Sequence, residues 1–104
     1  MKIVEIVPHQ RARLYAMLVA KEEAIRKNGR GTYTRVGRKS GSSARWRHKA
    51  YSGSVQLKHD SSEIVTARIR ASTPEDERQL LSSFLGFVDR HSGDHVSVIT
   101  IRYQ

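Results

Sequence analysis

Between residues 32 and 71 the chain alternates polar and apolar side chains in four short segments, and this feature limits the folds open to it. The segments are TYTRV (32–36), ARWRHKAY (44–51), VQLKH (55–59) and EIVTARIRA (63–71). A period of two residues is typical of β-strands that turn one face to a core and the other to solvent. Segments rich in Gly, Ser and Asp separate them, so we predict that consecutive strands pair as antiparallel hairpins.

Two amphipathic stretches flank this region and predict two helices. A first helix is expected over residues 9–27, where apolar residues recur at helical spacing before Asn28 and Gly29. A second is expected over residues 74–91, directly after Thr73, because Thr is a favourable N-cap residue.

The two ends of the chain add one predicted strand each, KIVEIV (2–7) and HVSVITIRY (95–103). The element order is then β-α-β-β-β-β-α-β. We expect an α+β fold in which a single, mainly antiparallel sheet carries both helices on one face. The preferred topology is a ferredoxin-like split β-α-β with an added hairpin. With 104 residues the chain is long enough for one core only, so residues 1–104 are expected to form a single domain.

Charge is the unusual property of the composition. There are 19 Lys and Arg residues against 10 Asp and Glu residues, which gives a formal net charge of +9. Thirteen of the cations are Arg, whose planar fork of donors suits phosphate. No acidic residue lies between Glu23 and Asp60. A field of one sign concentrates anions, so the sequence indicates a basic protein with an anionic partner.

The segment SSARWRHKAYSG (42–53) suggests where that partner binds. At a period of two, Arg45, Arg47 and Lys49 share a face with Tyr51, whereas Trp46 points to the other face and is predicted to lie in the core. Extended to the other strands, this pattern predicts one open cationic face that binds RNA or single-stranded DNA. The residues expected to contact nucleic acid are Arg35, Arg45, Arg47, Lys49, Tyr51, Lys58, Arg68 and Arg70. Tyr33 and Tyr51 are expected to stack on bases within that field.

Other functions remain open on the sequence alone. The outward cations are also typical of a solvated sheet face without a partner. A second hypothesis is a non-enzymatic interaction module that binds an acidic protein, or that forms a homodimer through the apolar C-terminal strand. A third is a metal-independent ribonuclease that uses His48 and His59. We favour a binding protein over an enzyme and interpret both histidines as structural.

Metal and cofactor sites are not predicted. His91, Asp94 and His95 are close in sequence, but a turn at Gly93 separates the histidines and no fourth ligand is evident. The chain has no cysteine, and its N-terminal apolar run is too short for a signal peptide or a membrane span. We therefore expect a soluble, cytoplasmic protein with no membrane partner.

Overall fold

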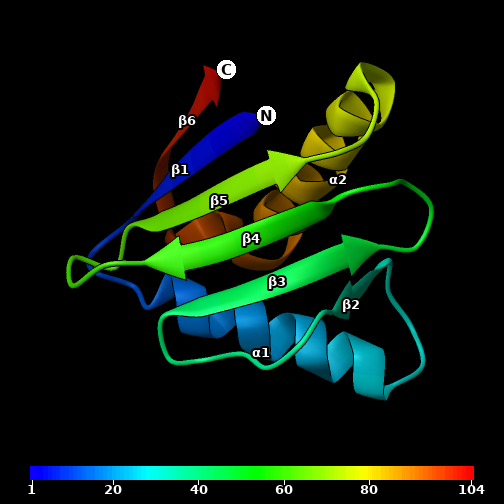
Figure 1. The fold of residues 1–104 in the computed structure, drawn as a ribbon. Coiled ribbons are helices and arrows are strands. Elements are labelled where there is room, and N and C mark those ends of the chain that lie inside the picture. The colour runs from blue at the N-terminus through cyan, green and yellow to red at the C-terminus, as the bar shows by residue number, and fades with distance from the viewer.

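All six predicted strands form, and they join into one antiparallel sheet in the order β2-β3-β4-β5-β1-β6 (Figure 1). The computed structural model describes residues 1–104. The strands are β1 (Lys2–Pro8), β2 (Tyr33–Arg35), β3 (Ser43–His48), β4 (Ser54–His59), β5 (Val65–Arg70) and β6 (Val96–Tyr103). The edges differ in length, because β2 has three residues and β6 has eight.

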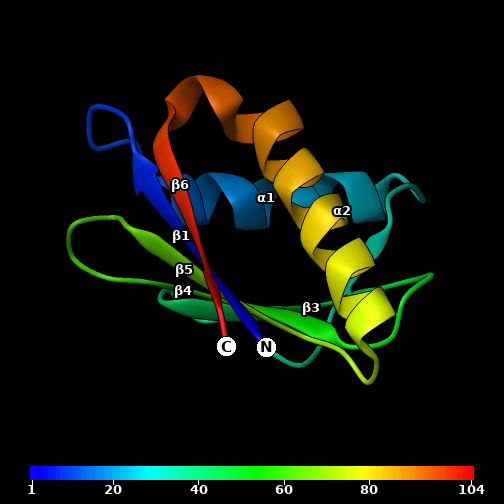
Figure 2. The same ribbon diagram turned by 90° about the horizontal axis from the view of Figure 1, so that it is seen from above.

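The two helices, α1 (Leu14–Lys27) and α2 (Pro74–Ser92), lie on the same face of the sheet, as predicted (Figure 2). Strands β5 and β6 flank β1, so the β5-α2-β6 unit is a split β-α-β. Three strands separate β1 from β2, where a ferredoxin-like sheet has one. The added strands are the β3–β4 hairpin, which agrees with the preferred topology. One face of the sheet is therefore covered and the other is open.

The first helix begins five residues later than predicted. Pro8 is the last residue of β1, where it pairs with Val96, and the backbone N–H of His9 donates to the carbonyl of His95 at 2.7 Å. Gln10 and Arg11 then adopt positive φ angles, 53° and 58°, which no α-helix contains. The interpretation of residues 9–13 as helical was wrong because β1 continues through the proline and a turn follows.

The second helix begins and ends close to the prediction. The hydroxyl of Thr73 accepts a hydrogen bond from the backbone N–H of Asp76 at 3.1 Å, which satisfies one of the free donors of the first turn. The acidic residues of that turn are Glu75, Asp76 and Glu77. Negative charge there is favourable beside the positive end of the helix dipole.

A core of 19 buried residues fills the space between the helices and the covered face. Trp46 is fully buried, as predicted, and its ring packs against Tyr33, Phe84 and Phe87 with centroid distances of 5.4, 6.4 and 5.3 Å. None of the helices combines the length and the hydrophobicity that a membrane span needs.

The faces of β2 are the reverse of those predicted. Tyr33 is buried against Trp46, and its hydroxyl lies 2.9 Å from Ser83 Oγ on α2. Arg35 points to the same side and donates to Glu23 of α1 at 2.9 Å. Alternation determines that Tyr33 and Arg35 share a face but not which face it is. The burial of the large Tyr33 ring and the carboxylate of Glu23 determine the orientation.

Candidate functional site

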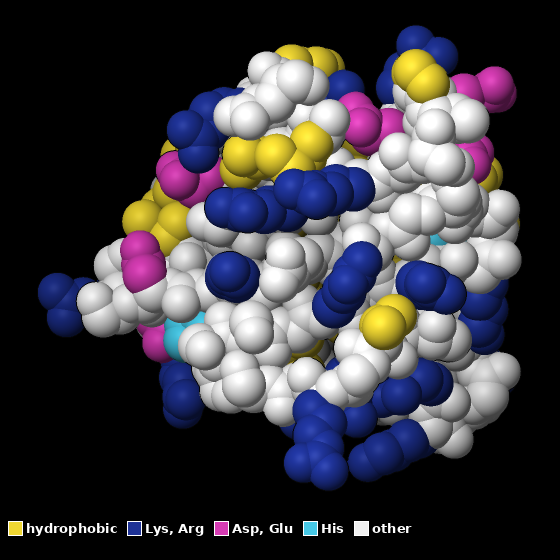
Figure 3. Space-filling view, viewed as in Figure 1, with side chains coloured by type: hydrophobic (Ala, Val, Ile, Leu, Met, Phe, Trp, Pro, Cys, Tyr) yellow, Lys and Arg dark blue, Asp and Glu magenta, His cyan; other side chains and the backbone are white.

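The open face of the sheet carries six cationic side chains. Five of them lie in strands whose intervening residues face the core, so the alternation of each strand brings its cations to the solvent side. The sixth lies on β6 and is placed on this face by its pairing with Ile3. The cations are Arg45 and Arg47 in β3, Lys58 in β4, Arg68 and Arg70 in β5, and Arg102 in β6. Figure 3 shows Lys and Arg side chains spread over this face.

The strand register places three of these arginines in one row across the sheet. Arg45 pairs with Gln56, which pairs with Arg68. Arg68 pairs with Ile3, and Ile3 pairs with Arg102. With about 4.8 Å between neighbouring strands, the three arginines follow one another at about 10 Å and span about 19 Å. A second row contains Arg47 and Arg70.

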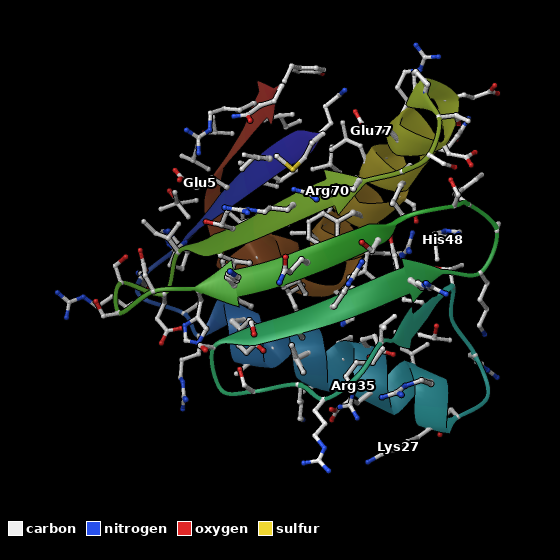
Figure 4. The ribbon with its side chains drawn as sticks, in the orientation of Figure 1. Glu5, Lys27, Arg35, His48, Arg70 and Glu77 are labelled. Carbon is white, nitrogen blue, oxygen red and sulfur yellow. The ribbon has the colours of Figure 1, made fainter.

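None of the six cations forms an ion pair. All the salt bridges of the protein involve other basic groups, on α1, the loops, β1, β2, β4 or the N-terminus. The one acid on the open face is Glu5, which pairs across the sheet with Thr66 and Thr100 (Figure 4). Six cations against one carboxylate leave the face with a net charge of +5, more than half of the net charge of the chain.

Five of the eight residues predicted to contact nucleic acid lie on this face: Arg45, Arg47, Lys58, Arg68 and Arg70. Lys49 and Tyr51 follow the end of β3 in the β3–β4 loop, so they stand at the rim of the face. Arg35 lies on the covered side. Arg102 was not among the predicted contacts, but it lies on the same face, because it pairs with Ile3, which pairs with Arg68 on the other side.

The face has no aromatic side chain. Tyr33 is in the core, and the ring of Tyr51 lies against His48 with a centroid distance of 4.6 Å. The expectation that Tyr33 stacks on bases within the cationic field was wrong, because the faces of β2 are reversed. Tyr51 lies at the rim of the field, because β3 ends before it. The chemistry of the open face is that of guanidinium and ammonium groups.

The largest hollow of the surface, about 610 Å³, lies where the β3–β4 loop meets the end of β5. Its lining includes Arg45, Arg47 and Arg70, together with loop residues Tyr51 to Gly53. No acidic residue lines it. Sequence reasoning missed the hollow, because it depends on the packing of a loop against a strand that lies elsewhere in the sequence.

His48 and His59 both take part in structural contacts. His48 Nδ1 accepts a hydrogen bond from the backbone N–H of Ala50 at 2.9 Å, so the neutral ring carries its proton on Nε2, which donates to Ser83 Oγ at 3.1 Å. Burial lowers the pKa of His48, which favours this neutral form. The hydroxyl of Ser83 also forms a hydrogen bond with the hydroxyl of Tyr33, and burial raises the pKa of Tyr33 to about 12, so the Tyr33 hydroxyl stays neutral.

The ring of His59 is stacked on Tyr15 at 4.5 Å, and Nε2 lies 2.6 Å from the carbonyl of Gly41. His48 and His59 also lie at opposite ends of the hairpin. Six residues of strand at about 3.3 Å each separate these ends by about 20 Å. The two rings therefore cannot act on one phosphate as a general acid and base.

The residues of the C-terminal turn do not form a metal centre. His91 packs edge-on against Phe87, with 4.7 Å between the ring centroids, and the turn Gly93–His95 follows α2 directly. No group of three His, Cys, Asp or Glu side chains in the protein could hold a metal ion.

No family model, curated protein or solved structure matches this chain. The open face and the hollow at its end are therefore the features on which a functional proposal rests.

Proposed function

We propose that the protein binds nucleic acid, as RNA or single-stranded DNA, through phosphate contacts made by the open sheet face. One observation carries the proposal: six cations from four strands share this face, and none of them has an acidic partner. Lys and Arg that neutralise phosphates release condensed counterions, and this release supplies most of the affinity of sequence-independent binding.

The chemistry of the face favours phosphate over an acidic protein. Five of the six cations are Arg, whose fork of N–H donors binds phosphate oxygens in pairs. Protein interfaces depend on a desolvated centre of aromatic or apolar anchors. The open face has no aromatic residue, and Ile3, at its centre, is only 9% exposed; its large exposed apolar side chain, Val98, lies at the β6 edge. Because base stacking has little support on this face, we expect weak dependence on base sequence.

A charge-matched pair of variants tests the proposal. Lys58, Arg68 and Arg102 are replaced together by Ala on the open face. The control replaces Lys21, Lys27 and Arg78, which are exposed cations of the two helices without an ion pair. Both variants have the same net charge, so both lose the same long-range attraction for an anion.

The measurement is the salt dependence of affinity for a labelled oligonucleotide, followed by fluorescence anisotropy. The slope of log K against log salt concentration is negative, and each lost contact to a single strand makes it shallower by about 0.7. The slope of the open-face variant should therefore be shallower by about 2. The control should keep the slope of the parent. Equal slopes for the two variants, or binding of a poly-glutamate peptide as tight as that of the oligonucleotide, would contradict phosphate binding by this face.

A homodimer through β6 is a second candidate, and the exposed edge of the sheet favours it. β6 presents eight residues at this edge, with Val98 51% and Tyr103 72% exposed. Long apolar edges tend to pair with another strand, and antiparallel pairing of two β6 strands would join two cationic faces into one. Sedimentation at about 100 μM should then give twice the 11.8 kDa mass of the chain. Val98→Lys should give a monomer, whereas Thr34→Lys at the opposite edge should not change the mass.

A further inference from the structure

We propose that the hollow at the end of the open face is a site for a terminal phosphate, the phosphomonoester at the end of a nucleic acid strand or of a free nucleotide. This inference deepens the proposed function, and it rests on that function where the phosphate is the end of a nucleic acid strand. Three arginines line the hollow, Arg45 and Arg47 from β3 and Arg70 from β5. Figure 4 shows Arg70 and His48 at the same end of the sheet.

The register explains why a hollow exists between these arginines. Ser54 of β4 pairs with Arg70, and the antiparallel register of β3 and β4 brings Arg47 to its other side. The two arginines are therefore about 10 Å apart across β4, and the residue between them has a small side chain. Arg45 follows Arg47 on the same strand at about 6.6 Å. Three long cationic side chains thus surround a hollow that Ser54, itself only 8% exposed, also lines.

The donors of these arginines are free to bind an anion. Arg45, Arg47 and Arg70 make no ion pair, and the one side-chain hydrogen bond of Arg70 runs from its Nε to Met1 Sδ at 3.2 Å. A thioether is a weak acceptor, so phosphate oxygens would replace it readily. On the loop side, the carboxylate of Asp76 already accepts hydrogen bonds from the backbone N–H and the hydroxyl of Ser52.

The rim of the hollow is held in place before any ligand arrives. Ser52 Oγ lies 2.7 Å from Ser72 Oγ and 2.7 Å from Asp76 Oδ2, so the β3–β4 loop is tied to the start of α2. Gly53 has a φ of 100°, and a Cβ there would lie 1.9 Å from the carbonyl oxygen of Arg70. The loop backbone therefore packs directly on the end of β5. A preformed rim reduces the ordering that binding would otherwise require.

The number of cations favours a terminal phosphate over a phosphodiester within a strand. A phosphomonoester carries a charge of about −1.5 to −2 near pH 7 and has three free oxygens. A phosphodiester carries one negative charge. Three guanidinium groups in one hollow match a phosphomonoester better than a phosphodiester, because each guanidinium can donate two hydrogen bonds to adjacent phosphate oxygens. Tyr51 and His48 also line the hollow. Their rings lie against each other at a tilt of 36°, with 4.6 Å between the centroids, and give the first base or sugar an aromatic surface to pack on.

The test compares one oligonucleotide in three forms, with a 5′-phosphate, with a 3′-phosphate and with neither. We expect one phosphorylated form to bind the parent protein at least about tenfold more tightly than the unphosphorylated form, as a set of charge-assisted hydrogen bonds implies. Arg47→Ala/Arg70→Ala should remove this preference. Arg47→Lys/Arg70→Lys should weaken the preference without removing it, because Lys keeps the positive charge and lacks the paired N–H donors of the guanidinium group. The control Lys58→Ala/Arg102→Ala lowers the affinity of all three forms and keeps the preference.

Equal affinity for the three forms, or a preference that the Arg47/Arg70 variants retain, would overturn the terminal-phosphate site and leave the proposed function intact. A nucleoside monophosphate, compared with its nucleoside, separates the two sources of the phosphate. If the monophosphate binds in the hollow and no oligonucleotide binds, the site stands and the proposed nucleic-acid function fails.

Discussion

Trp46 offers a sharp test of the packing that supports the open face, because its ring is fully buried and yet its Nε1 has no hydrogen-bond partner. Two substitutions should then have very different effects. Trp46→Ala leaves a cavity between β3 and α2 and should destabilise the protein by about 3 to 5 kcal/mol. Trp46→Phe keeps a six-membered ring in contact with Phe84 and Phe87.

The Phe variant loses two buried carbon atoms, which costs about 1.6 kcal/mol at about 0.8 kcal/mol for each buried CH₂. It also removes a buried N–H without a partner, whose desolvation costs about 1 to 3 kcal/mol. These contributions nearly cancel, so the free energy of unfolding of Trp46→Phe should lie within about 1.5 kcal/mol of that of the parent.

Urea unfolding followed by far-ultraviolet circular dichroism measures all three proteins without depending on tryptophan fluorescence. The fluorescence of the parent supplies a separate check, since Trp46 is its single tryptophan and should emit as a buried indole. A loss of about 3 kcal/mol or more in Trp46→Phe would refute the reasoning, because it would mean that the indole N–H has a partner.

Two further predictions follow from the loops and the termini. Gly53→Ala should destabilise the protein by at least about 2 kcal/mol in urea unfolding, because its Cβ would meet backbone atoms at a positive φ, whereas Gly41→Ala, with open space around it, should change stability by less than about 1 kcal/mol. Hydrogen bonds from Lys2 and from the N-terminal ammonium hold the pKa of Glu77 below its ordinary value, so their stabilisation is present above that value and is lost as the pH falls through the folded pKa. Thermal unfolding between about pH 6 and pH 3 should therefore show a smaller loss of stability in Glu77→Gln than in the parent, and parallel curves for the two proteins would contradict this assignment.

The sequence was sufficient to predict the order of the elements, the antiparallel sheet and the single covered face, because each depends on a periodicity that the residues display directly. The capping of α2 by Thr73 was equally local. The start of α1 could not be predicted from local sequence, because it depends on the pairing of Pro8 with Val96, two residues from opposite ends of the chain.

The candidate site could be predicted only where burial on one side of a strand is strong. Trp46, Leu57 and Ile69 are fully buried, and they orient the cations next to them in β3, β4 and β5. β2 has no such asymmetry in its sequence, since either Tyr33 or Val36 can serve as its inward residue. Its orientation depends on Ser83 and Glu23, which the two helices bring to it from distant parts of the sequence.

Strand β3 shows how closely the fold and the proposed function depend on one register. Ala44 and Trp46 contribute to the core, and the residues next to them, Arg45 and Arg47, contribute to the open face. A shift of one residue against β4 would bury two guanidinium groups and expose the indole. The free-energy cost of burying a guanidinium group without a partner is far larger than the binding energy that an exposed arginine gains from a phosphate. Packing of the core therefore determines the register. Phosphate binding then uses a face whose geometry is already determined. Substitutions of the open-face cations should for that reason change affinity and its salt dependence while the free energy of unfolding stays close to that of the parent.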